Sequence, residues 1–141
     1  MFGAGRTLVI GLGCSSSATG HEVVELITRC LDEAQLSLAD VLLLATHERR
    51  RSNAALSAAA TWLGLPLHAL NDGALAPGVP GTCEAVAAAA GALILPKRKS
   101  RFVTCAIARC NDAFSPVGFG QPVIPSAAMA ASTLVTSGAG S

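Results

Sequence analysis

The chain has 141 residues, of which 51% are hydrophobic and 13% are charged, and its net charge is +1. This length fits one domain with a single core, and the low charged share indicates that much of the chain is buried. The small net charge, the short basic runs and the lack of an aromatic stacking motif disfavour a nucleic-acid-binding module.

The five cysteines include no CxxC pair, and the chain does not begin with a charged and then apolar signal peptide. An odd number of cysteines without pairing is typical of a reducing compartment, so we expect free thiols and a cytoplasmic protein. The three histidines lie far apart and share no metal-ligand spacing with the cysteines, so neither a metal nor a cofactor is expected. No apolar stretch is long enough to span a bilayer, and no membrane association is expected.

The first predicted strand, residues 7–10, runs into a loop of small residues and then into a helix. The loop carries Gly11, Gly13, Cys14, Ser15, Ser16 and Ser17. Glycines let the backbone approach a ligand, and the following helix N-terminus presents free N–H groups with a partial positive charge. The loop is therefore typical of a site for an anionic ligand, but also of an ordinary tight strand-to-helix connection. Its spacing is neither GxGxxG nor GxxxxGK(S/T), so the nucleotide-binding mechanisms of those motifs are not supported.

Helix and strand patterns alternate along the next part of the chain. Thr19 and Glu22 have the spacing of a capping box, and apolar residues at helical intervals extend the first helix to about residue 34. Residues 41–45 are continuously apolar, which is typical of a strand covered on both faces. This strand ends at a segment rich in basic residues, 46–51.

The same alternation continues to residue 108. The elements are predicted, in order, as a helix capped by Ser52 or Asn53 and stopped at Gly64, a strand at 67–70, a loop at 71–81, an alanine-rich helix at 82–91, and strands at 93–95 and 102–108 joined by a basic turn at 96–101. The pattern favours an α/β fold with a largely parallel, mixed sheet and a C-terminal antiparallel hairpin. We expect one domain, 1–110, and a low-complexity tail rich in Gly, Pro, Ala and Ser, 111–141.

Open α/β sheets bind ligands beyond the carboxyl ends of their parallel strands, and the loops 11–18 and 46–51 both leave that edge. His47 and Glu48 stand where a general base or acid could act, and helix capping or ion pairing is the alternative interpretation. Cys14 at a helix start is a candidate nucleophile, with buried packing as its alternative.

Four segments resemble, in order, motifs of one protein family. They are 10–14 for G-(I/L)-G-C, 44–50 for A-T-x-(D/E)-x-K, 63–67 for L-G-(L/V)-P-L, and 95–108 for L-x-P-K followed by V-T-x-A-(I/V)-A. The family comprises the C-terminal domain of CbiG and the stand-alone CobE proteins of cobalamin (vitamin B12) biosynthesis. The chain departs from the family pattern at Ser15 and Ser16, where basic residues are frequent, at Arg50, where Lys is usual, and at Asn53, where an acidic residue is usual.

The resemblance implies a three-layer α/β/α domain that binds a corrin-ring precursor, a tetrapyrrole with peripheral carboxylates, as a carrier or pathway accessory. Because CbiG opens a ring-A lactone, a hydrolase acting on the lactone or an acyl group of a precorrin is the alternative, with His47 and Glu48 as its catalytic residues. Other enzymes of the pathway are implied partners. Carboxylates call for basic side chains and backbone donors, so the predicted rim is the loop 11–17, Arg50 and Lys97. The alternative is that the basic runs 49–51 and 97–101 are solvated turns.

Overall fold

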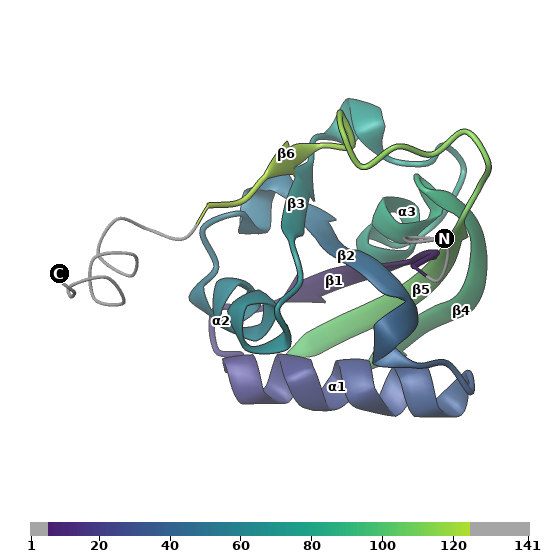
Figure 1. Ribbon diagram of the computed structural model, residues 1–141. Coiled ribbons are helices and arrows are strands. Elements are labelled where there is room, and N and C mark those ends of the chain that lie inside the picture. The colour runs from purple at the N-terminus through teal and green to yellow at the C-terminus, as the bar shows by residue number, and fades with distance from the viewer. Residues whose placement is uncertain (1–5, 125–141) are drawn as a thin grey trace, which may run out of the picture.

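The computed structural model describes residues 6–124 and contains one six-stranded sheet in the order β4-β5-β1-β2-β3-β6 (Figure 1). The strands are β1 (Leu8–Cys14), β2 (Val41–His47), β3 (Leu67–Leu70), β4 (Gly91–Lys99), β5 (Val103–Cys110) and β6 (Gln121–Pro122). β1, β2 and β3 are parallel, whereas β5 pairs antiparallel with β1, β4 with β5, and β6 with β3. The predicted α/β class with a mixed sheet is confirmed, but the sheet is not largely parallel, because two of these five strand pairings are parallel and three are antiparallel.

Helices cover both faces of the sheet. They are α1 (Gly20–Glu33), α2 (Ala54–Leu63) and α3 (Thr82–Ala88), with short 3-10 turns η1 (Leu38–Asp40), η2 (Glu48–Arg50) and η3 (Asp72–Ala74). Side chains alternate across a strand, so Leu8 and Ile10 of β1 pack in one core cluster with α1 and α2, while Val9 packs with Val86 of α3. Within residues 6–124, no helix is long and apolar enough to cross a membrane.

Local signals explain where α1 and α2 begin and end. The Thr19 hydroxyl accepts a hydrogen bond from the backbone N–H of Glu22 at 3.1 Å, as the capping spacing predicts. Asn53 caps α2 by accepting from the N–H groups of Ala55 and Leu56, and Gly64 ends the helix with a left-handed φ of 70°. These predicted boundaries are confirmed.

The predicted basic turn at 96–101 is wrong in its extent. Residues 96–99 belong to β4, which pairs with β5 as far as Lys99, and only residues 100–102 connect the two strands. The strand can continue through Pro96 because β4 is an edge strand, where the missing N–H of proline needs no partner. Register irregularities on either side of Leu95 accommodate the ring.

Part of the predicted tail contacts the sheet. β6 pairs with β3, the Val123 N–H donates to the Leu67 carbonyl at 2.8 Å, and the Phe114 and Phe119 rings meet edge-to-face at 4.9 Å. A two-residue strand has no sequence periodicity that could have predicted it. The domain boundary at residue 110 stays a proposal, which limited proteolysis after removal of 111–141 would test, and residues 125–141 of the tail lie outside the described residues.

Candidate functional site

A cavity of about 330 Å³ opens at the carboxyl ends of β1 and β2, beside the turn between β4 and β5. Its cationic side chains are Arg49 and Arg50, which follow β2, and Lys99 and Arg101, at the β4–β5 turn. No Asp or Glu side chain is among the described residues that line it. Four cations without a lining carboxylate make this cavity attractive to an anion.

The predicted start of the first loop is wrong, because residues 11–14 belong to β1, which continues to Cys14 through its pairing with β5. Of the predicted loop residues, Gly13 and Cys14 at the end of β1 and Ser15 after it line the cavity, whereas the exposed Ser16 and Ser17 do not. The Ser15 N–H donates to the Phe102 carbonyl at 3.0 Å, and the Ser17 N–H donates to the Ser15 hydroxyl at 3.2 Å. Because these two amides already have partners, they are not free to bind a ligand.

Gly11 has a packing role, and it does not line the cavity. A Cβ at this position would lie 2.2 Å from the carbonyl oxygen of Cys83 and 2.9 Å from the backbone nitrogen of Ala87. Glycine is therefore required for α3 to lie this close to β1, and ligand approach is not needed to explain it.

Cys14 is buried, and its burial raises the pKa of the thiol above the usual range, against a smaller lowering by Arg50. A thiol with a raised pKa is protonated at neutral pH, so the geometry favours packing over nucleophilic catalysis. All five cysteines are unpaired, and no group of three or more His, Cys, Asp or Glu within 6–124 is placed to hold a metal ion.

His47 is the last residue of β2, lines the cavity and is only 4% exposed. Its Nε2 lies 2.6 Å from Oδ1 of Asp72, and its Nδ1 accepts a hydrogen bond from the Arg49 backbone N–H at 3.1 Å. This pattern places the imidazole proton on Nε2, where it is donated to the carboxylate. Both ring nitrogens are therefore engaged inside the protein, and the exposed Glu48 does not line the cavity.

Thr46 holds the end of β2 against β1. Its side chain is completely buried, and its hydroxyl donates to the Leu12 carbonyl at 2.7 Å. The strand end that carries His47 and leads to Arg50 is thus tied to the neighbouring strand by a side-chain bond in addition to the sheet pairing.

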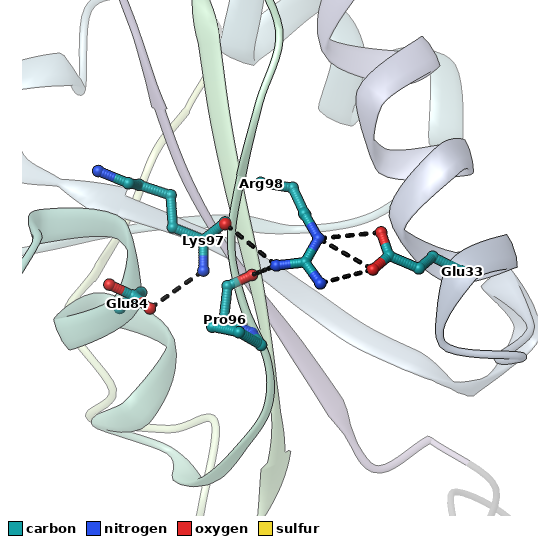
Figure 2. A network of polar contacts seen from close by, with 5 residues as sticks. All are labelled: Glu33, Glu84, Pro96, Lys97 and Arg98. Atoms are coloured by element: carbon teal, nitrogen blue, oxygen red, sulfur yellow. Dashed lines mark hydrogen bonds and ion pairs between the residues drawn. The ribbon is translucent and has the colours of Figure 1, made fainter.

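Lys97, predicted as part of the rim, does not line the cavity. Figure 2 shows the side chains of Lys97 and Arg98 diverging from β4. Arg98 forms a forked ion pair with Glu33 of α1, with nitrogen–oxygen distances from 2.5 to 3.0 Å, and the Lys97 backbone N–H donates to Glu84 of α3 at 3.0 Å (Figure 2). Successive residues of an extended strand point to opposite faces, so the basic run is divided.

The structure thus brings together five of the ten predicted site residues: Gly13, Cys14, Ser15, His47 and Arg50. Asp72, the partner of His47 outside the cavity lining, was missed because it lies in η3, 25 residues along the chain from His47. In the sequence, Lys99 and Arg101 are only members of a basic run. Their place in the cavity could have been predicted only from the end of β4 at Lys99, which the sequence pattern did not indicate.

Comparisons with known proteins agree with the family that the motifs suggest. Protein CobE of Sinorhizobium sp is 36% identical over 63 residues, a match that covers 45% of this chain and 41% of that protein. The match thus spans less than half of the curated relative's length.

Two solved structures share the fold. That of CobE, a protein from the cobalamin (vitamin B12) biosynthetic pathway, has a TM-score of 0.67 and 27% identity, and covers 74% of this chain and 91% of its own. That of cobalamin biosynthesis protein chiG from Agrobacterium tumefaciens str. C58 has a TM-score of 0.65 and 27% identity, and covers 74% and 99%. The family model "Cobalamin synthesis G C-terminus" matches residues 8–108, which is most of this chain. The chain therefore belongs to this family.

Proposed function

We propose that this member of a cobalamin-biosynthesis family binds a corrin-ring precursor through its peripheral carboxylates, as a carrier or accessory of the pathway. The observation that carries the proposal is the cavity at the ends of β1 and β2, where Arg49, Arg50, Lys99 and Arg101 gather without a lining carboxylate. Guanidinium groups bind carboxylates with paired, charge-assisted hydrogen bonds, which suits a ligand with several acidic side chains.

The size of the cavity limits how such a ligand would bind. At about 330 Å³ it lies at the small end of the range of small-molecule sites, about 300–1,000 Å³. It has room for one edge of a macrocycle with its acidic side chains, while the rest of the ring lies outside. A partly exposed ligand can be passed to another enzyme of the pathway, so transfer to such partners is part of the proposal.

Hydrolysis of the lactone or of an acyl group is the second candidate, and the observation in its favour is that His47, which lines the cavity, pairs with Asp72 outside it. A general base needs a ring nitrogen that can reach water or substrate. The Nδ1 of His47 accepts from Arg49, and its Nε2 donates to Asp72. This arrangement supports binding over turnover.

The test is a titration of the purified protein with precorrin intermediates, followed by their visible absorption. We expect a saturable spectral change with unchanged ligand mass, and a weaker affinity at higher salt because the rim charges are exposed. A change of ligand mass that is lost in His47→Ala would favour the hydrolase. Absence of any saturable change would refute binding.

The expected cytoplasmic location belongs to the same proposal. The five unpaired cysteines support it, because thiols are kept reduced in the cytosol.

A further inference from the structure

The β4–β5 turn, residues 100–102, is tied to α1 by a single carboxylate. Oε2 of Glu22 accepts hydrogen bonds from the Ser100 hydroxyl at 2.5 Å and from the Phe102 backbone N–H at 2.8 Å. These two hydrogen bonds, of which the one from Ser100 has the larger effect, hold the pKa of Glu22 below its usual range. The carboxylate is therefore ionised at neutral pH and fixes both ends of the turn.

This turn carries one of the two cationic sides of the cavity. Lys99 and Arg101 lie at the β5 side, and Arg49 and Arg50 lie at the β2 side. β1 separates β5 from β2, so the two backbone segments stand about two strand spacings, ~10 Å, apart. This arrangement suits a ligand edge with two carboxylates, one for each side, such as those carried on neighbouring carbons of one pyrrole ring.

We propose that Glu22 is a positioning residue of this site, which holds the turn so that the cavity recognises pairs of neighbouring carboxylates. The inference rests on the proposed function and names the chemical feature of the ligand that the site selects. Glu22 does not line the cavity, so it acts through Lys99 and Arg101.

The sign of the effect separates positioning from simple charge. Glu22 is an anion close to Arg101, and the loss of an anion would by Coulomb's law strengthen the binding of an acidic ligand. A weaker binding after its removal therefore reports the position of the turn and cannot come from the change in charge.

Two porphyrins serve as probes in a fluorescence titration of the full chain. Uroporphyrin carries an acetate beside a propionate on each pyrrole ring, and coproporphyrin carries a methyl in place of the acetate. We expect the affinity of the wild type for uroporphyrin to be at least about tenfold higher than for coproporphyrin. This ratio corresponds to the binding free energy of one charge-assisted hydrogen bond. Glu22→Ala should reduce this ratio to about threefold or less and change the coproporphyrin affinity by less than about twofold.

Two further variants act as controls. In Glu22→Gln the amide oxygen still accepts both hydrogen bonds, so most of the ratio should be kept. Glu33→Ala removes an equal charge from the same helix, but Glu33 binds Arg98 outside the cavity, so the ratio should not change. Circular dichroism shows whether each variant is folded.

An unchanged ratio in folded Glu22→Ala, or an equal loss of affinity for both probes, would overturn the role of Glu22 while leaving the proposed function intact. If the wild type bound neither porphyrin but still gave the saturable change with precorrin intermediates, this inference would fail and the proposed function would stand. If it bound neither the porphyrins nor the precorrins, both would fail.

Discussion

The two basic runs of the chain, 49–51 and 97–101, are both rich in Lys and Arg, but the fold places their side chains differently. The first directly follows β2, and its Arg49 and Arg50 both reach the cavity. The second begins inside β4, where the side chains of Lys97 and Arg98 diverge (Figure 2) and do not line the cavity. Only its end beside and within the β4–β5 turn, Lys99 and Arg101, lines the cavity. A run of charges therefore becomes a site only where the backbone turns.

The partners of the second run show what an extended strand does with charge. Arg98 points to α1 and pairs with Glu33, and the backbone of Lys97 is bonded to Glu84 of α3. In the 3-10 turn η2, by contrast, the neighbouring Arg49 and Arg50 both line the cavity at the end of β2. Arg49 and Arg50 are exposed and take part in none of the ion pairs of residues 6–124, so they can meet a ligand without first breaking one.

Arg50→Ala should give the largest effect on this comparison. We expect corrinoid binding to weaken by about 1.5–3 kcal/mol, the contribution of a hydrogen bond to a charged group, with little change in folding stability. Absorption titration and thermal unfolding measure the two quantities. Unchanged affinity, with wild-type binding confirmed, would return the first run to the class of solvated turns.

Thr46→Val tests the strand end from which the first run departs. The variant keeps the shape of the side chain but leaves the buried Leu12 carbonyl without its hydroxyl partner. The free energy of unfolding should fall by about 1–2 kcal/mol in chemical denaturation. Thr46→Ser, which keeps the hydroxyl, is the matched control, and an equal loss in both variants would contradict the role of the bond.

Arg98→Ala sharpens the other half of the comparison through pH. Arg98 lowers the pKa of Glu33, so the stability from this carboxylate is present above its unfolded pKa, about 4.3, and is lost as pH falls through the lower folded value. The variant should restore the usual pKa, remove this acid-dependent loss and leave ligand binding unchanged. A carbon-13 NMR titration of the Glu33 carboxyl measures its pKa in both proteins. A Glu33 pKa that stays low in Arg98→Ala would contradict the role of the ion pair.

Lys97→Ala should have the smallest effect. Lys97 does not line the cavity, and its one contact with Glu84 uses the backbone, so affinity and stability should both change by less than about 0.5 kcal/mol. A loss of affinity as large as that of Arg50→Ala would break the comparison and restore the rim that the sequence predicted.

Sequence patterns predicted the features that depend on neighbouring residues. The caps at Thr19 and Asn53 and the stop at Gly64 were predictable because each involves a few consecutive backbone groups. β6 was not predicted, because two residues are too few to show a strand pattern and they form a strand only through their pairing with β3. The same holds within the site: Arg50 was predictable from the end of a strand, whereas the pairing of His47 with Asp72 depends on how the end of β2 meets η3, which lies far along the chain.

The close contact of β1 with α3 has a consequence for how the site can change in evolution. The cations at Arg49, Arg50, Lys99 and Arg101 are exposed, so they can be exchanged with little loss of folding stability, and ligand preference is free to drift. Gly11 has no such freedom, because a methyl group there would collide with the backbone of Cys83 and displace α3, whose first residue, Thr82, lines the cavity. Among related proteins, we therefore expect amino-acid differences at the cationic rim positions and the same residue at the position of Gly11.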